Sequence, residues 1–308
     1  MKRDPTAPRV SDSAARVNGL IAPLLHFWYT STSLTVSSKS QQHVWQSSLV
    51  ELSFRHPFLL HGILAVAAVH KAGVFPAESQ RLMVQSSSHM DVAISAIRTH
   101  IEVPDPAICV PLFAASGLLV VHSLGLAQVH PPADPVANLC DWMRLVQGQK
   151  VTVQQNWTRL LASEVAPILL SVGGEQRHAG SEMLRLKGLV EQKVPIDSDV
   201  RDPYLQAIEQ LDLVFTNIHH LLRSGEMFSV AITLSWTATI PAVVLDLISD
   251  RDQLALVILA YFAVLFKLQE ASWWMRGWGD WTLDAVQSQL DAEYRQWTDW
   301  PTQQMRSK

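Results

Sequence analysis

The residues best able to contact a ligand gather near the carboxyl end, where tryptophans and glycines surround one arginine. Trp273 and Trp274 precede the stretch 276–279 (RGWG), and six of the eleven tryptophans lie between positions 273 and 300. Indole rings offer a large apolar surface with polar N–H groups, and glycine lets the backbone approach that surface closely. Such a cluster either fills a core or forms the wall of an apolar pocket. Arg276 can cover an indole by stacking or meet a ligand oxygen at a pocket mouth.

Two of the twelve histidines, His61 and His70, lie in an otherwise apolar stretch. There a histidine is either a hydrogen-bonded core residue or a polar contact inside an apolar pocket, with a proton to exchange near neutral pH. His26, Trp28 and Tyr29 form a second aromatic group. The residues predicted to contact a ligand are His26, Trp28, Tyr29, His61, His70, Tyr261, Phe266, Trp273, Trp274, Arg276 and Trp278.

The sequence carries no recognisable catalytic or cofactor motif. It has no glycine-rich phosphate loop, no HExxH and no CxxC, and no serine stands in a nucleophile elbow. Two acidic groupings, at 197–202 and at 250–252, come at apparent helix starts, where carboxylates complement the helix dipole. Capping is therefore favoured over metal binding. We expect no metal and no cofactor, and we can name no catalytic residue.

Three stretches define the helices that must position these side chains. The run 254–266 is uncharged and apolar on every helical face, as in a helix buried on all sides. The stretch 56–73 begins with His-Pro and ends with glycine, which suit the first turn and the C-terminal cap of a helix. The stretch 107–127 is a second buried-helix candidate.

No segment alternates apolar and polar residues with a period of two, and no repeat is present. The pattern predicts an all-α fold, a single domain of roughly ten to thirteen helices over residues 13–308 after a disordered tail at 1–12. Residues 30–40 read as a Ser/Thr-rich loop. The best internal break is 171–180, with three glycines in ten residues.

Composition sets further bounds. Hydrophobic residues make up 48% and charged residues 17% of the chain, which argues against disorder. The net charge of −4 supplies no basic field for nucleic acid. Cys109 and Cys140 are too few for a disulfide framework or a cysteine-rich zinc site. With no secretory signal, an intracellular place, cytoplasmic or nuclear, is expected. Pro111, Gly117, His122 and Gly125 interrupt the run 108–129, so no membrane span is expected.

Four separated blocks carry a resemblance to a known family. They are 24–36 (LLHFWYTSTSLTV), 53–73 (SFRHPFLLHGILAVAAVHKAG), 255–281 (ALVILAYFAVLFKLQEASWWMRGWGDW) and 294–301 (YRQWTDWP). In this order they resemble the C-terminal regulatory domain of fungal zinc-cluster transcription factors, especially the sterol uptake control regulators. The resemblance runs from about Leu24 to Met305. It implies an all-helical, often dimeric domain that holds a hydrophobic small molecule in a deep pocket. The six-cysteine zinc cluster of those regulators is not in this sequence, so no direct nucleic-acid contact is expected.

Two functions are consistent with these observations. The first is a non-catalytic module that binds a sterol, terpenoid or polyketide-like molecule and acts through a partner or as a homodimer. The second is a metal-independent cyclase that uses the same pocket, for example for a Diels–Alder-type cycloaddition in fungal secondary metabolism. Such a reaction needs orientation and a few hydrogen bonds. The sequence favours the module over the enzyme.

Overall fold

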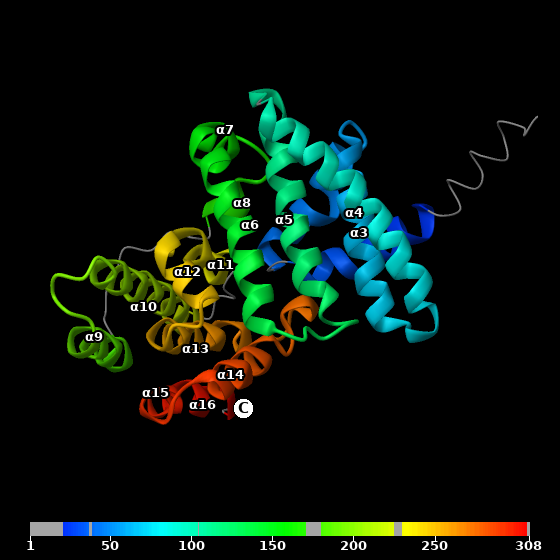
Figure 1. Ribbon diagram of the computed structural model, residues 1–308. Coiled ribbons are helices and arrows are strands. Elements are labelled where there is room, and N and C mark those ends of the chain that lie inside the picture. The colour runs from blue at the N-terminus through cyan, green and yellow to red at the C-terminus, as the bar shows by residue number, and fades with distance from the viewer. Residues whose placement is uncertain (1–20, 37–38, 104, 171–179, 225–229, 307–308) are drawn as a thin grey trace, which may run out of the picture.

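The computed structural model describes residues 21–36, 39–103, 105–170, 180–224 and 230–306. Within these ranges the chain is built of helices and turns with no strand, which confirms the all-α fold (Figure 1). The fifteen α-helices are α2 (Leu49–Ser53), α3 (Pro57–Val74), α4 (Ser79–Glu102), α5 (Cys109–Leu126), α6 (Pro135–Gln155), α7 (Trp157–Leu161), α8 (Ala166–Leu170), α9 (Ser181–Lys193), α10 (Arg201–Ser224), α11 (Val230–Thr239), α12 (Ala242–Ser249), α13 (Gln253–Lys267), α14 (Trp278–Gln289), α15 (Ala292–Arg295) and α16 (Asp299–Arg306). Short π and 3₁₀ turns join them: η1 (Trp28–Thr32), η2 (Ser33–Thr35), η3 (Lys39–Gln41), η4 (Val44–Ser48), η5 (Pro76–Glu78), η6 (Pro106–Ile108), η7 (Trp273–Met275) and η8 (Gln296–Thr298).

Helix α13 is the centre of the carboxyl-terminal half. Every residue from Leu254 to Phe266 is buried, as its uncharged sequence predicts. The helix begins where the Asp252 carboxylate accepts hydrogen bonds from the backbone N–H groups of residues 254 and 255, each at 3.0 Å. The Tyr204 hydroxyl donates to the same carboxylate at 2.6 Å. The capping interpretation of this acidic residue is thereby confirmed.

A second group of helices is formed by α3, α4 and α5, which run side by side (Figure 1). Helix α3 begins with proline in its first turn, as predicted, and packs against both of its neighbours. Gly62 permits the approach of α5, because a Cβ at that position would lie 3.3 Å from the Leu118 side chain. Ser86 and His122 add a buried polar contact of 2.9 Å between α4 and α5.

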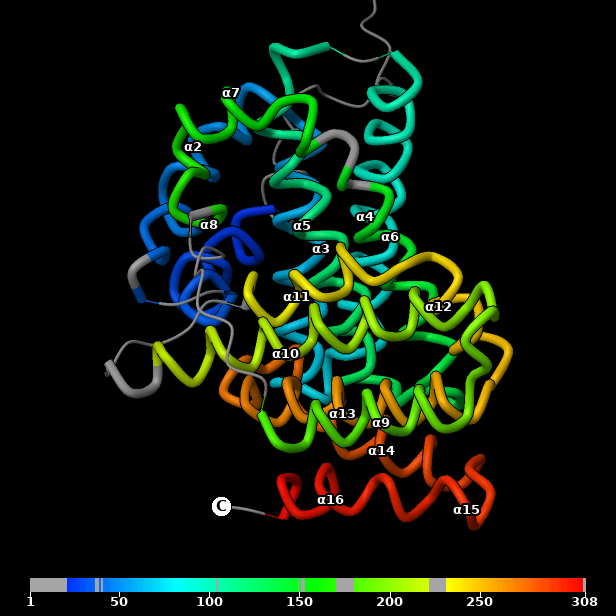
Figure 2. The backbone as a smooth tube through the Cα atoms, turned by 90° about the vertical axis from the view of Figure 1, so that its left-hand side faces the viewer, coloured from blue at the N-terminus to red at the C-terminus, as the bar shows by residue number. Residues whose placement is uncertain are grey.

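Helix α6 connects this group to the rest of the molecule. It contacts α5 on one side and α11, α12 and α14 on the other. Below α6 in Figure 2, helices α9, α10, α13, α14 and α16 lie roughly across the direction of α3, α4 and α5. Most of the buried apolar side chains of both groups belong to one continuous core. The helices around α6 are therefore the place where the two groups meet.

Several element boundaries differ from expectation. Residues 28–35 form the helical turns η1 and η2, although a loop was expected from residue 30. Helix α13 ends at Lys267, one residue after the uncharged run 254–266. Gly277 then takes a left-handed conformation, with φ of 78°, and directly precedes α14. Ten to thirteen helices were expected, whereas the described residues include the fifteen α-helices from α2 to α16. The difference comes from α-helices of only four or five residues, namely α2, α7, α8 and α15. The tail at 1–12 and nearly all of the break at 171–180 lie outside the described residues.

Two of the described helices are long and apolar enough to cross a membrane by length and composition alone. They cover Pro57–Val74 and Pro106–Leu126, and the number rises to three if the bent pair of α11 and α12 is taken as one span. About two thirds of each of the two windows is buried inside the protein. Their apolar sequences are thus used in packing the core. The first of these candidates was not anticipated from the sequence.

Candidate ligand-binding site

A cavity of about 340 Å³ lies where α5, α6 and α11 come together. Ligand pockets in proteins typically measure about 300–1,000 Å³, so this one suits a molecule of modest size. Its described lining is Val36, Gln41, Trp45, Phe113, Gly117, Val120, Val121, Val146, Lys150, Val153, Gln154, Ile168, Leu169, Ala231, Leu234, Ser235, Ala238, Thr239 and Trp274. Most of these side chains are apolar, so the space favours an apolar guest.

Each of the three helices contributes one stripe of residues at helical spacing. On α5 the stripe runs from Phe113 through Gly117 to Val121, and on α11 from Ala231 to Ala238. Small residues on these stripes leave space between the backbones. At Gly117 a Cβ would lie 3.7 Å from the Trp45 ring, an ordinary van der Waals distance, so the missing side chain leaves space beside this indole. The cavity therefore arises because α5 and α11 carry small residues where they face each other and α6.

Two tryptophans of the cavity wall carry a buried N–H group with no hydrogen-bond partner among the described residues. These groups are Nε1 of Trp45 and Nε1 of Trp274. By contrast, Nε1 of Trp28 donates to the Trp45 carbonyl at 3.1 Å, and Nε1 of Trp236 donates to the Ala207 carbonyl at 2.9 Å. A buried donor without an acceptor costs free energy. Two further unpartnered indoles, Trp142 and Trp273, are not part of the described wall.

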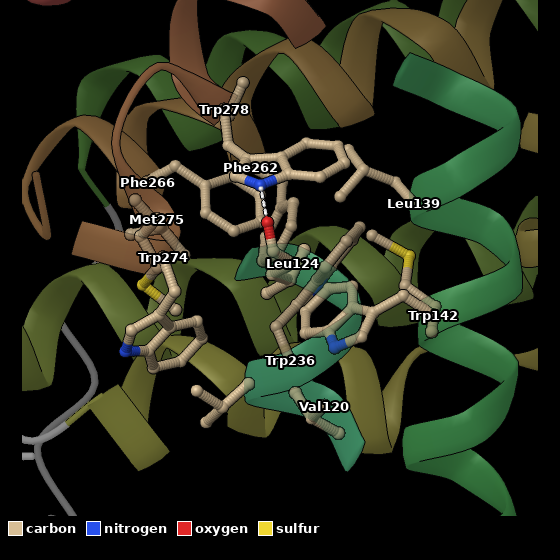
Figure 3. Close-up of a cluster of buried hydrophobic side chains, with 14 of the residues drawn as sticks. Val120, Leu124, Leu139, Trp142, Trp236, Phe262, Phe266, Trp274, Met275 and Trp278 are labelled. Carbon is tan, nitrogen blue, oxygen red and sulfur yellow. Dashed lines mark hydrogen bonds between the residues drawn. The ribbon is translucent and has the colours of Figure 1, made fainter. Parts of the chain in front are cut away.

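The tryptophan-rich carboxyl end mostly fills the core. Trp278 donates from Nε1 to the Leu124 carbonyl at 3.0 Å, tying α14 to α5 (Figure 3). Its ring lies 6.3 Å from that of Phe266, centroid to centroid. Tyr261 is stacked on Trp300 at 5.0 Å. Among the eleven residues predicted to contact a ligand, only Trp274 belongs to the described cavity wall.

His70 belongs to a polar and aromatic group beside the cavity's Trp274. Its ring is stacked on Trp273 with a centroid distance of 4.3 Å, and Nδ1 lies 3.0 Å from the Thr32 hydroxyl. Burial, together with the Arg276 charge, lowers the pKa of His70 to about 4. Arg276 itself is exposed, and its carbonyl accepts from the Gln128 amide at 2.8 Å. The expected stacking of Arg276 on an indole is not among the cation–π contacts of the described residues.

The other predicted residues are dispersed. His61 of α3 faces His89 of α4, with 2.9 Å between their Nδ1 atoms. Burial lowers the pKa of both imidazoles. His26 and Tyr29 are exposed, whereas Trp28 is fully buried between them. Ligand contact by the residues outside the wall stays a prediction. Among the described residues no three His, Cys, Asp or Glu side chains gather to hold a metal ion.

Sequence reasoning missed the wall contributed by α6 and α11. The signal was present as small and apolar residues at spacings of three and four on α11, from Ala231 to Ala238. A stripe of that kind looks the same whether a neighbouring helix or empty space lies against it. The pairing of α5, α6 and α11 is a tertiary property that the single sequence does not reveal.

The chain is similar to known proteins of one kind. Residues 23–162 match the family described as fungal specific transcription factor domain. A protein of Gibberella zeae described as "Zn(2)-C6 fungal-type transcription factor" is 23% identical over 282 residues, which cover 82% of this chain and 54% of that protein. The chain thus spans about half the length of this relative. These findings support a fungal transcription factor-like domain, and its matched part includes the cavity wall from Val36 to Gln154.

Proposed function

We propose that this chain is a binding module for a hydrophobic small molecule of the sterol, terpenoid or polyketide-like kind, within a fungal transcription factor-like domain. The observation that carries the proposal is the apolar cavity of about 340 Å³, whose wall includes the indole side chains of Trp45 and Trp274. An apolar guest in the cavity removes apolar wall surface from water and gains dispersion contacts with it.

The biological role follows as part of the same proposal. A bound guest stabilises one arrangement of α5, α6 and α11 relative to others. A partner or a second copy of the chain then binds that arrangement preferentially. We also propose that the chain is related to the sterol uptake regulators, that it forms a homodimer, and that it acts in the nucleus or the cytoplasm. Cyclisation catalysis remains a hypothesis, because no observation on the described residues favours it over binding.

Thermal unfolding with neutral apolar probes tests the proposal. Ergosterol and 1-hexadecanol are added separately to the 308-residue chain, and tryptophan fluorescence is followed in parallel. At a ligand concentration of about 100 Kd, binding adds about 2.7 kcal/mol. For a domain of this size, that raises the Tm by roughly 4 °C. Quenching or a blue shift of the indole emission is expected at the same concentrations.

A cavity-filling variant locates the binding. Ala238→Phe places a ring where α11 lines the cavity, whereas the exposed Ala77→Phe in η5 adds the same ring away from it. We expect Ala238→Phe to abolish the probe-induced shift and Ala77→Phe to keep it, both with a helical circular dichroism spectrum. Absence of a shift with either probe in the unaltered chain overturns the proposal. Undiminished binding by a folded Ala238→Phe chain overturns the location.

A further inference from the structure

One charged side chain lies in the apolar wall of the cavity. Lys150 follows Val146 by one helical turn on α6 and precedes Val153 by almost one more, and all three line the space. Lys150 is exposed overall, so its ammonium group reaches solvent while the residue still contributes to the wall. Lysine commonly lays its methylene stem along apolar surface and keeps its charge in water. We conclude that the ammonium group marks the mouth of the cavity.

Among the described residues, no carboxylate balances the charge at this mouth. Lys150 is the only ionisable residue among those that line the cavity in the described part of the chain. No described carboxylate forms an ion pair with it. Arg144, on the same helix, provides the contrast, since it meets Asp141 at 3.7 Å and Asp246 at 3.3 Å. Gln154, one turn beyond Lys150, lines the same mouth with an amide.

From this arrangement we propose that the cavity takes an amphiphilic monocarboxylic acid, with its apolar body inside and its carboxylate at the ammonium group of Lys150. This inference rests on the proposed function and specifies its ligand class. One positive charge complements one negative charge, which favours a carboxylate over a phosphate or diphosphate head. The Gln154 side-chain NH₂ can supply a further donor to the same group.

The test compares an acid with its uncharged ester. Hexadecanoic acid and methyl hexadecanoate are titrated into the full chain at pH 8, below their aggregation concentrations, and indole quenching gives the Kd. The acid is expected to bind about two- to fivefold more tightly than the ester, the range of a partly exposed ion pair. Its advantage should shrink between 50 and 500 mM salt as the pair is screened.

Substitutions of Lys150 show whether its charge causes the tighter binding of the acid. Lys150→Met keeps an apolar stem and removes the charge, so the acid should lose its advantage while ester affinity stays within twofold. Lys150→Arg should retain the advantage. Lys71→Met is the matched control, because Lys71 lies on α3 outside the cavity wall.

The outcomes separate the two proposals. If acid and ester bind equally to the unaltered chain, or Lys150→Met leaves the advantage of the acid intact, the ligand class is wrong while the binding module stands. Equal weakening of both probes by Lys150→Met also overturns it, since the stem rather than the charge would then matter. If neither acid, ester nor the neutral probes bind, the module itself is refuted.

Discussion

Acid should destabilise this protein through a histidine in its core, His122. Only 6% of this residue is exposed, and its Nε2 lies 2.9 Å from the Ser86 hydroxyl. Burial lowers the pKa of His122 to about 4, from 6.5. The unfolded chain therefore binds a proton more readily than the folded one. The stability that depends on this neutral imidazole is fully present above about pH 6.5 and is lost as the pH falls toward 4.

The size of the effect follows from the two pKa values. One pKa unit corresponds to about 1.4 kcal/mol, so the whole transition is worth about 3 kcal/mol for this side chain. Between pH 7 and pH 5, the part of it that is lost amounts to about 2 kcal/mol. Other histidines with a lowered pKa, above all His70, add to the loss. The contribution of His122 is therefore the difference in pH-dependent loss of unfolding free energy between the unaltered chain and a variant that lacks this histidine.

The measurement is urea unfolding at pH 7 and pH 5 with His122→Leu as the variant. Leucine removes the titrating group, and the Ser86 hydroxyl keeps the Ala65 carbonyl as an acceptor at 2.9 Å. We expect the variant to lose about 2 kcal/mol less than the unaltered chain between the two pH values. His219→Gln, at an exposed position of α10, is the control and should follow the unaltered chain. Equal losses in His122→Leu and the unaltered chain, at equal m-values, would refute the reasoning.

Three further substitutions test local features of the fold. Gly125→Ala should cost about 1–3 kcal/mol, because its Cβ would lie 2.6 Å from the Trp273 ring. In Gly73→Ala the new methyl group meets nothing within 4 Å, and the change should raise the unfolding free energy by about 0.5–1 kcal/mol. Thermal melts of both variants check the pair, and a stable Gly125→Ala chain would contradict the close contact. Asp252→Ala removes the N-cap of α13 and the acceptor of the Tyr204 hydroxyl, so denaturant unfolding should show a loss of at least about 1 kcal/mol.

The fold class was predictable because its signals are local. An uncharged run such as 254–266 has no polar face to expose, so burial on all sides follows from composition. Proline at the start of α3 likewise marks a helix start. The short turns from Trp28 to Thr35 were not predictable, because Ser/Thr-rich sequence has no strong preference among loop, 3₁₀ and π geometries.

The site was less predictable, and neighbouring tryptophans show why. Trp273 and Trp274 follow each other on the single turn η7, yet Trp273 stacks on His70 and Trp274 lines the cavity. Composition identifies both as apolar rings with a polar N–H. Which ring meets protein and which meets open space depends on where α3, α5 and α11 pass, and that information is not local.

The cavity also lies at the boundary between two parts of the chain. Its α5 and α6 walls come from the region similar to the fungal transcription factor domain, whereas α11 and Trp274 come from beyond residue 162. A guest in contact with both parts stabilises their present arrangement by its differential affinity for it, and only by that amount. On α11 the small residues face the cavity, whereas Trp236 anchors the helix by stacking on Phe262 and by its hydrogen bond to the Ala207 carbonyl. In the proposed function, ligand occupancy is coupled to the packing of α11 on α6, and this coupling is how the module would pass its state to a partner.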